Sequence, residues 1–368
     1  MRILARAFLV LILIGSAAVS TVIAQDATPA ADETVRVAFV YVSPVGDMGW
    51  TWAHDQGRLA LEENLPNVET AFQESVPENP ADAERVIRQF AQDGYDIVIT
   101  TSFGYMNPTA NVAEDFPDTT FVHISGFMTG PNLSTAFGKI EEPRYVSGLI
   151  AGAMTESNQI GYVAAYPIPE VIRGINAFTL GVRETNPEAT VTVVWTNTWF
   201  GPQLERQAAE ALLDGGADVI AQHQDTAGPQ LAAQDRDAYG VGYNADMSIQ
   251  APEAVLTSPI WNWGVYYTDL VEQVMAGTWE TNQHWGGWED GLVGLAPIGP
   301  MVPDEVRAMA EAEVASFESG ESTIYTIFTG PLLDQDGEER VADGVAMTDE
   351  ELLGMNWFVE GVIGEVPE

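Results

Sequence analysis

The 368-residue chain contains no cysteine and few basic residues. Without cysteine there can be no disulfide framework and no thiol chemistry. Fourteen Lys and Arg residues stand against 54 Asp and Glu, Lys139 is the only lysine, and the formal net charge is −40. Such a surface repels nucleic acid and anionic lipid, so we exclude both as partners.

The acidic excess is open to two interpretations: an ordinary solvated face, or adaptation to salty or acidic surroundings. Under the second, we expect the free energy of unfolding to rise with salt, because counterions screen repulsion among the carboxylates. Urea unfolding at low and at molar sodium chloride measures this. Equal stability in the two solutions would contradict adaptation to salt.

The chain also lacks the motifs of common enzymes. There is no GxxxxGK[ST], no HExxH and no GxSxG, and the histidines are scattered rather than set at metal-ligand spacing. Acidic pairs such as Glu141-Glu142 suit acid–base chemistry, but 54 acids produce such pairs by chance. We therefore expect no enzyme, no metal and no cofactor. The histidines are His54, His123, His223 and His284.

Residues 1–24 have the pattern of a secretory signal peptide. Arg2 and Arg6 precede an apolar run at 8–14, and the small residue Ala24 stands before Gln25 at a suitable cleavage site. Residues 25–34 read as a polar, flexible tether. With no cysteine at the cleavage point to carry a lipid, we expect a soluble protein that is periplasmic or otherwise extracytoplasmic.

Residues 43–55, SPVGDMGWTWAHD, are the stretch around which the chain is organised. They follow an apolar run at 35–42 and precede a helical pattern at 51–65, and a turn at the carboxyl end of a strand is where open α/β sheets bind ligands. Asp47 offers hydrogen-bond acceptors and Trp50 a flat face for stacking. The alternative is that Asp47 caps the helix and Trp50 belongs to the core.

Strand and helix signals alternate through most of the chain, and 46% of its residues are apolar, enough for two cores. Residues 90–102 and 212–224 share a helix end, a glycine and an apolar strand, which suggests two similar lobes, although chance similarity stays open. We predict an α/β fold of two doubly wound parallel-sheet lobes. The first comprises 35–141 plus about 261–325, and the second 142–260 plus the tail, about 326–368.

The predicted strand ends share aromatic side chains with isolated polar groups beside them. This composition suits a flat ligand with polar edges, held in a cleft between the lobes. The aromatic candidates are Trp50, Phe103, Tyr105, Trp199, Phe200, Trp261 and Trp263. The acidic candidates are Asp47, Asp225 and Asp246.

Four segments carry a resemblance to a known family: GDMGW at 46–50, FPDTTFVHISG at 116–126, YVSGLIAGAMT at 145–155, and 160–182. With these segments the chain resembles the basic membrane protein family of ABC-transporter substrate-binding proteins, which includes bacterial purine nucleoside receptors. The resemblance implies a type I periplasmic-binding fold with three crossover segments. It also implies closure of the lobes on a small molecule and docking on an ABC permease. We expect a monomer.

The resemblance further implies a purine stacked between Trp50 and Phe200, with Trp199 a near substitute, and acids at Asp47 and Asp246. This chain departs from the nucleoside receptors where Ser125, Tyr243 or Asn244, and Trp261 replace polar groups of the family. Fewer ribose-binding groups and more aromatics favour a flatter ligand. A branch of the family with the GDxGW and TTSFGYM wording is similar and binds adenine, so we expect adenine first and nucleosides second.

Three alternatives remain at this point. The same fold suits a sugar or a flavin-like ligand, although sugar sites usually carry more arginine than the three near these loops. A sensory receptor would close in the same way. A nucleoside hydrolase would need a cluster of aspartates for Ca²⁺ near the first strand, where Asp47 stands alone.

Overall fold

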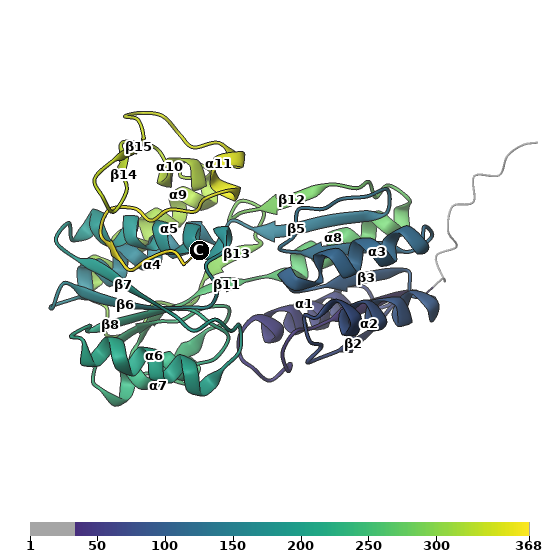
Figure 1. Cartoon of the computed structure of the whole chain (residues 1–368), viewed down its shortest axis with the longest axis horizontal. Helices are drawn as coiled ribbons and strands as arrows, with labels where there is room; N and C mark the ends of the chain where they lie inside the picture. The colour runs from purple at the N-terminus through teal and green to yellow at the C-terminus, as the bar shows by residue number, and fades with distance from the viewer. Residues whose placement is uncertain (1–33, 368) are drawn as a thin grey trace, which may run out of the picture.

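The computed structural model describes residues 34–367, which form two α/β lobes side by side (Figure 1). The predicted signal peptide, and all but the last residue of the predicted tether, lie outside the described residues. None of the described helices is both long and apolar enough to cross a membrane.

The first lobe contains a six-stranded parallel sheet in the order β12-β5-β4-β3-β1-β2. Its central strands are buried on both faces, which explains why they read as continuous apolar runs. Helices α1 (Trp50–Asn64) and α8 (Trp263–Ala276) pack together, as do α2 (Pro80–Gln92) and α3 (Met106–Asp115). The strands are β1 (Val35–Val40), β2 (Val68–Gln73), β3 (Ile97–Thr100), β4 (Thr120–Ile124), β5 (Leu133–Gly138) and β12 (Gln283–Gly286).

The second lobe repeats this plan with the parallel order β10-β9-β8-β6-β7-β16. Helix α4 (Glu141–Met154) packs against α5 (Pro169–Thr185), and α6 (Pro202–Asp214) against α7 (Gly228–Asp235). Two parallel-sheet lobes are therefore confirmed. The strands are β6 (Gln159–Ala164), β7 (Thr190–Trp195), β8 (Val219–His223), β9 (Tyr239–Val241), β10 (Val255–Thr257) and β16 (Val362–Ile363).

Helix α2 illustrates how the local sequence sets an element. The Asn79 side chain accepts a hydrogen bond from the Asp82 N–H at 3.0 Å, and Pro80 occupies the first turn, where its missing N–H costs nothing. Val86 and Ile87 are buried against the sheet. Gly94 ends the segment with a φ of +75°, a conformation that favours glycine.

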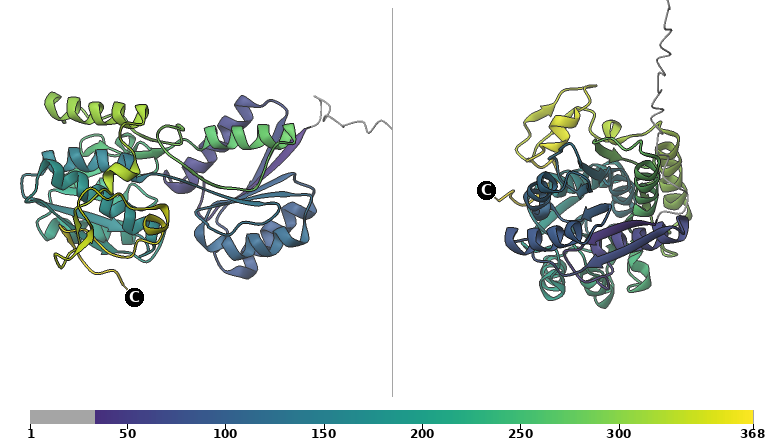
Figure 2. Two further views of the ribbon diagram at one scale, coloured as in Figure 1. Left: turned by 90° about the horizontal axis from the view of Figure 1, so that it is seen from above. Right: turned by 90° about the vertical axis from the view of Figure 1, so that its right-hand side faces the viewer.

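The chain passes between the lobes at 138–141, at 257–263 and at 286–293. Strands β11 (Pro259–Trp261) and β13 (Val293–Leu295) pair antiparallel within these passages. Helix α9 (Asp304–Ser319) packs against α4, over the second lobe (Figure 2). The predicted first-lobe boundary near residue 325 therefore needs correction: the chain has already crossed back at β13.

The tail lies on the second lobe, where β16 pairs with β7 at the edge of the sheet. Before β16 the tail forms a short hairpin and two short helices, of which α10 packs against α4 and α11 against α5. These elements are α10 (Ile324–Ile327), β14 (Leu332–Leu333), β15 (Glu339–Val341) and α11 (Asp349–Leu353).

Candidate functional site

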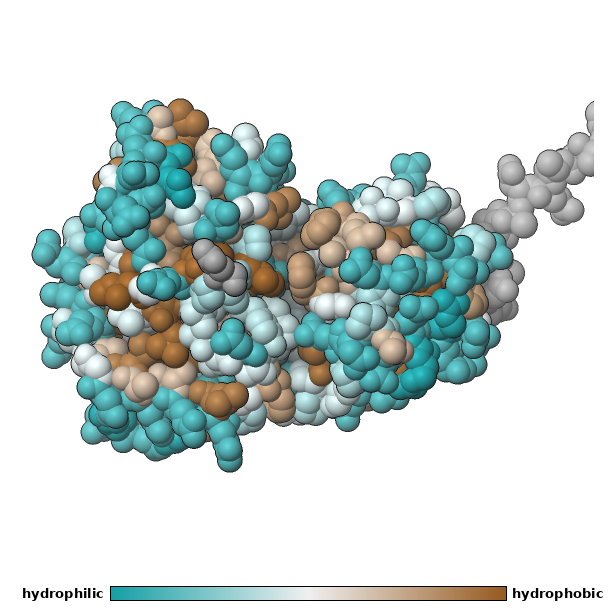
Figure 3. Space-filling model, viewed as in Figure 1, coloured by the Kyte–Doolittle hydropathy of each residue, from teal (hydrophilic) through white to brown (hydrophobic). Residues whose placement is uncertain are grey.

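The surface is hollowed where the two lobes meet (Figure 3), and a cavity lies inside this cleft. Residues that follow the carboxyl ends of strands in both sheets line it, as expected for open α/β sheets. Its empty volume, which includes space open to solvent, is about 360 Å³, so the closed cavity is small. The lining residues are Val42, Trp50, Ser102, Phe103, Ser125, Glu170, Trp199, His223, Asp225 and Tyr243.

The loop before α1 is held by Asp47. Its carboxylate accepts hydrogen bonds from the backbone N–H groups of Gly49 at 2.8 Å and Trp52 at 2.9 Å, and from the Ser43 hydroxyl at 2.6 Å. An acceptor here satisfies N–H groups that the first turn of a helix leaves free. Asp47 therefore does not line the cavity; it fixes the turn that presents Trp50.

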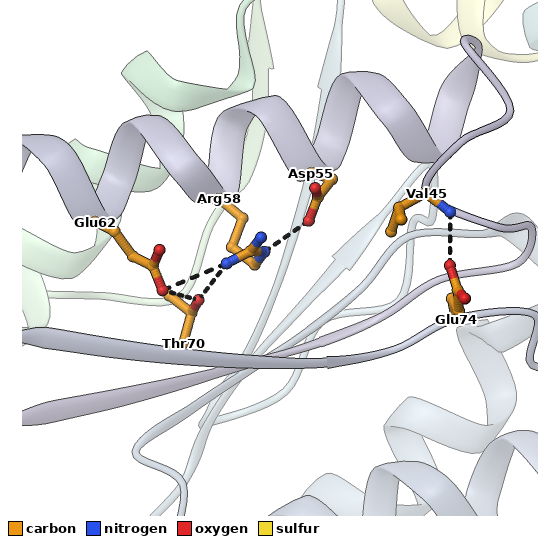
Figure 4. Close-up of polar contacts among 6 residues, drawn as sticks. All are labelled: Val45, Asp55, Arg58, Glu62, Thr70 and Glu74. Atoms are coloured by element: carbon orange, nitrogen blue, oxygen red, sulfur yellow. Dashed lines mark hydrogen bonds and ion pairs between the residues drawn. The ribbon is translucent and has the colours of Figure 1, made fainter.

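Helix α1 is tied to strand β2 by a polar network on the face that the helix turns toward that strand (Figure 4). Arg58 donates to Asp55 at 2.7 Å and to the Thr70 hydroxyl on β2 at 2.8 Å. Glu74, just after β2, accepts from the Val45 N–H at 2.7 Å. The loop and the helix that carry Trp50 are thereby held against the first-lobe sheet.

Two tryptophans from opposite lobes line the cavity. The Trp50 indole N–H donates to the Thr101 carbonyl, and its ring meets Trp261 edge-on at 5.4 Å between centroids. In the second lobe, Trp199 packs edge-on against Tyr166 at 5.0 Å. Aromatic faces held in this way suit a flat ligand bound between the lobes.

Asp225 supplies a carboxyl group to the cavity from the end of β8. The Asn244 amide donates to it at 3.1 Å, and the Trp261 indole N–H donates to the Asn244 carbonyl oxygen at 2.9 Å. Burial raises the pKa of Asp225 well above its usual value, and the carboxylates of Asp47 and Glu205 raise it further. Trp261 thus acts on the site through Asn244, which orients Asp225.

His223 and Tyr243 form a second wall of the cavity, and the buried Arg144 side chain lies behind it against the Tyr243 ring. Burial and the nearby charges of Arg144 and Arg173 lower the pKa of His223 well below its usual value, so the ring is neutral. A neutral imidazole offers one donor and one acceptor, and its Nδ1 has no partner among the described residues. The Arg144 guanidinium lies 4.0 Å from the centre of the Tyr243 ring.

Glu170, in the first turn of α5, is a further acid on the cavity wall. Burial raises its pKa to about 8, although the charges of Arg173 and Arg144 oppose the shift. No side chain or backbone group in residues 34–367 makes a hydrogen bond to its carboxyl group. Its accessible surface faces the cleft.

Several loops at the cleft contain residues in the left-handed region, which is costly for side chains other than glycine. Met48, Ser125, Asn197 and Asn244 have φ values of 62°, 67°, 55° and 68°. Each follows the carboxyl end of a strand, after β1, β4, β7 and β9 respectively. Of these four only Ser125 lines the cavity, and Ser75, Asn158 and Asp237 elsewhere in the described chain also have positive φ, so this feature does not by itself mark the site.

The two lobes touch each other beside the cavity, so the structure corresponds to a closed form. The Gly49 backbone lies against the Asp225 backbone of the other lobe so closely that an ideal Cβ would be 2.1 Å from the Asp225 carbonyl oxygen. The absence of a side chain at Gly49 permits this approach.

The structure brings together four of the ten candidate residues: Trp50, Phe103, Trp199 and Asp225 line the cavity. Their role in binding stays a prediction. The other six do not line it, for reasons that the contacts show. Asp47 caps α1, and Asp246 accepts a hydrogen bond from the Ser248 N–H. The Tyr105 hydroxyl donates to the Val76 carbonyl in the core, and Phe200 is exposed. Trp261 donates to Asn244, and Trp263 is buried against His54.

Six residues line the cavity but were not among the candidates: Val42, Ser102, Ser125, Glu170, His223 and Tyr243. Val42 and Ser102 follow strands directly, so their position at a strand end is a usable signal. Glu170 lies in the first turn of α5, the helix that follows β6. An acidic residue at this position is usually explained by its favourable interaction with the helix dipole, so it did not stand out as a ligand-binding candidate. Within residues 34–367 no cluster of His, Asp and Glu is arranged to hold a metal ion.

The family model described as ABC transporter substrate-binding protein PnrA-like (Bmp) matches residues 34–327. The chain belongs to this family. Members are solute-binding proteins of ABC transporters rather than enzymes, so a small-molecule ligand and a membrane permease are its partners.

Relatives of this substrate-binding protein differ in the ligand that their names state. A purine-binding protein of Brucella abortus is 44% identical over 339 residues, which cover 92% of this chain and 95% of the relative. A putative ABC transporter glucose-binding protein of Haloferax volcanii is also 44% identical over 339 residues, 92% of this chain and 83% of that relative.

Solved structures agree with the family assignment at the level of the fold. An ABC transporter solute-binding protein from Aeropyrum pernix K1 has a TM-score of 0.69 at 18% identity, covering 78% of this chain and 92% of that one. The predicted type I periplasmic-binding fold of this substrate-binding protein is therefore confirmed.

Proposed function

We propose that this substrate-binding protein is exported and captures a purine base outside the cytoplasm, adenine first and nucleosides second. The observation that carries the proposal is a small cavity lined by Trp50 of one lobe and Trp199 of the other. Such walls complement a planar heterocycle, and the small size of the closed cavity favours a base over a nucleoside. The purine-binding relative supports the same ligand class.

Closure supplies the mechanism of capture. A ligand that touches both lobes binds the closed form better and shifts the open–closed equilibrium toward it. Trp50 and Phe103 would hold the ligand from the first lobe, and Trp199 and Asp225 from the second. The closed protein, which we expect to be a monomer, would then dock on its permease.

A hexose such as glucose is the second candidate. The glucose-binding relative is as similar as the purine-binding one, and aromatic faces also pack against sugar rings. Sugar hydroxyls pair best with charged acceptors and donors, because hydrogen bonds to charged groups are stronger. Burial instead favours the neutral forms of Glu170, Asp225 and His223 in this cavity.

Calorimetric titration of refolded, ligand-free protein with adenine, adenosine, guanosine, riboflavin, ribose and glucose tests the proposal. We expect adenine to bind most tightly and Trp50→Ala to weaken binding at least about tenfold, because base–aromatic stacking contributes roughly 1–3 kcal/mol. Trp52→Ala is the matched control: it neighbours Trp50 in α1 but does not line the cavity.

Three other outcomes of the titration would contradict parts of the proposal. Glucose binding without purine binding would assign the protein to the sugar class. Preference for adenosine over adenine would show that the site accommodates a ribose and would contradict the order of ligands proposed. Equal losses in Trp50→Ala and Trp52→Ala would contradict the stacking role.

A further inference from the structure

Glu170 stands where two parts of the cleft join. Its side chain lines the inner cavity with Trp50 and Trp199, and it also lines an adjoining outer compartment with Arg173 and Trp285. Phe103 and Ser125 are shared by both parts. A carboxyl group at this junction, with no hydrogen-bond partner among residues 34–367, is free to contact a bound molecule.

The charged neighbours of Glu170 come from several elements. Arg173 lies on the same helix, and Arg144 and Glu141 lie on α4. Glu78 approaches from the first lobe, and the outer compartment adds His284 and Asp349. His223 and Asp225 share the inner wall.

The two arginines do not cancel the cost of burying a charge at Glu170. Arg173 is already engaged, since its Nε donates to Glu141 at 2.7 Å and its Nη1 to the Leu352 carbonyl at 3.0 Å. With the lobes closed, the pKa of Glu170 is about 8, so at neutral pH most molecules carry a carboxylic acid there. A carboxylic acid presents one O–H donor and one carbonyl acceptor side by side.

Building on the proposed function, we propose that the neutral carboxyl group of Glu170 binds a heterocycle edge that carries one donor and one acceptor, such as the amidine edge of adenine. The O–H donates to a ring nitrogen while the carbonyl accepts from the exocyclic amine. A carboxylate would instead place an acceptor oxygen against the lone pair of the ring nitrogen. Glu170 is thus a specificity-determining residue of the site.

Binding of the ligand with closure of the lobes then includes protonation of the Glu170 carboxyl group. Opening of the lobes would expose Glu170 to water, where a glutamate titrates with a pKa of about 4.3. Because the closed complex holds the proton up to about pH 8, closure between roughly pH 5 and 8 takes one proton from solution. The dissociation constant for adenine therefore rises with pH across this range, by up to about tenfold per unit.

Titration of the refolded protein with adenine at pH 6.5, in buffers of different ionisation enthalpy, measures the proton taken up per ligand bound. We expect about one proton for the wild type and nearly none for Glu170→Gln, whose amide keeps one donor and one acceptor. Affinity at pH 6.5 should stay within a few-fold in Glu170→Gln and fall at least about tenfold in Glu170→Ala. Thermal melts check that each variant folds.

Asp225→Asn removes the other acid that lines the cavity. Uptake that survives in Asp225→Asn and disappears in Glu170→Gln belongs to Glu170. Unchanged uptake in Glu170→Gln, or wild-type affinity in Glu170→Ala, would overturn the inference while leaving the proposed function in place. Failure of the wild type to bind any purine would overturn the proposed function, and this inference with it.

Discussion

Gly49→Ala is expected to weaken ligand binding by about a hundredfold or more while leaving the stability of the free protein nearly unchanged. With the lobes closed, the new Cβ would lie 2.1 Å from the Asp225 carbonyl oxygen and 2.6 Å from the Asp225 Cα. Both contacts are with backbone atoms, so no side-chain rotation relieves them. Closure must stop short, and a penalty of about 2.7 kcal/mol already corresponds to a hundredfold loss of affinity.

Gly46→Ala in the same loop is the matched control, because no heavy atom lies within 4 Å of the position of its Cβ. Calorimetry gives the affinity of each variant, and small-angle X-ray scattering with saturating ligand reports closure. We expect the wild type and Gly46→Ala to become more compact and Gly49→Ala to stay open. Normal affinity and normal compaction in Gly49→Ala would show that this contact does not control closure.

Arg173→Met is expected to lower the free energy of unfolding by about 3–5 kcal/mol, the usual range when one partner of a buried ion pair is removed. The side chains of Arg173 and Glu141 are 2% and 0% exposed, and their atoms are 2.7 Å apart. Removing the arginine leaves a buried carboxylate without its counter-charge. The Leu352 carbonyl in the tail also loses its donor.

Urea unfolding followed by circular dichroism measures the loss, and two further variants interpret it. Adding Glu141→Gln to Arg173→Met should restore part of the stability, since the unpaired charge disappears. Arg85→Met removes an exposed pair with Asp82, at 3.5 Å and with side chains 70% and 44% exposed, and should cost less than about 1 kcal/mol. Equal losses in Arg173→Met and Arg85→Met would contradict the role of burial.

The Gly49 variant tests ligand binding through closure of the lobes, whereas the Arg173 variant tests the stability of the fold. The contact of Gly49 with Asp225 exists only when the lobes close, so its disruption affects binding and not folding. The Arg173–Glu141 pair joins α5 to α4 inside the second lobe, so opening of the lobes is not expected to separate it. Comparing the two variants therefore separates the free energy of closure from the free energy of folding.

The polar loop before α1 shows how far local sequence could be interpreted. Residues 43–55 indicated a strand end, a turn and a helix, and the structure has them in that order. Whether Asp47 capped the helix or faced a ligand could not be decided, because both roles use the same carboxylate. Its hydrogen bonds to Gly49, Trp52 and Ser43 now assign it to the cap.

The sequence by itself predicted the two α/β lobes and a cavity lined by residues at strand ends, because hydrophobic periodicity and turn residues act over a few neighbouring positions. The family followed from the resemblance carried by segments such as 46–50 and 116–126. Only the tertiary structure decided which strand-end side chains meet. Sheet order and lobe closure bring Trp50 and Trp199 to one cavity, turn Trp261 toward Asn244 and add Glu170 from a helix start. These contacts join residues far apart in the chain, and no local pattern records the direction in which a side chain will point.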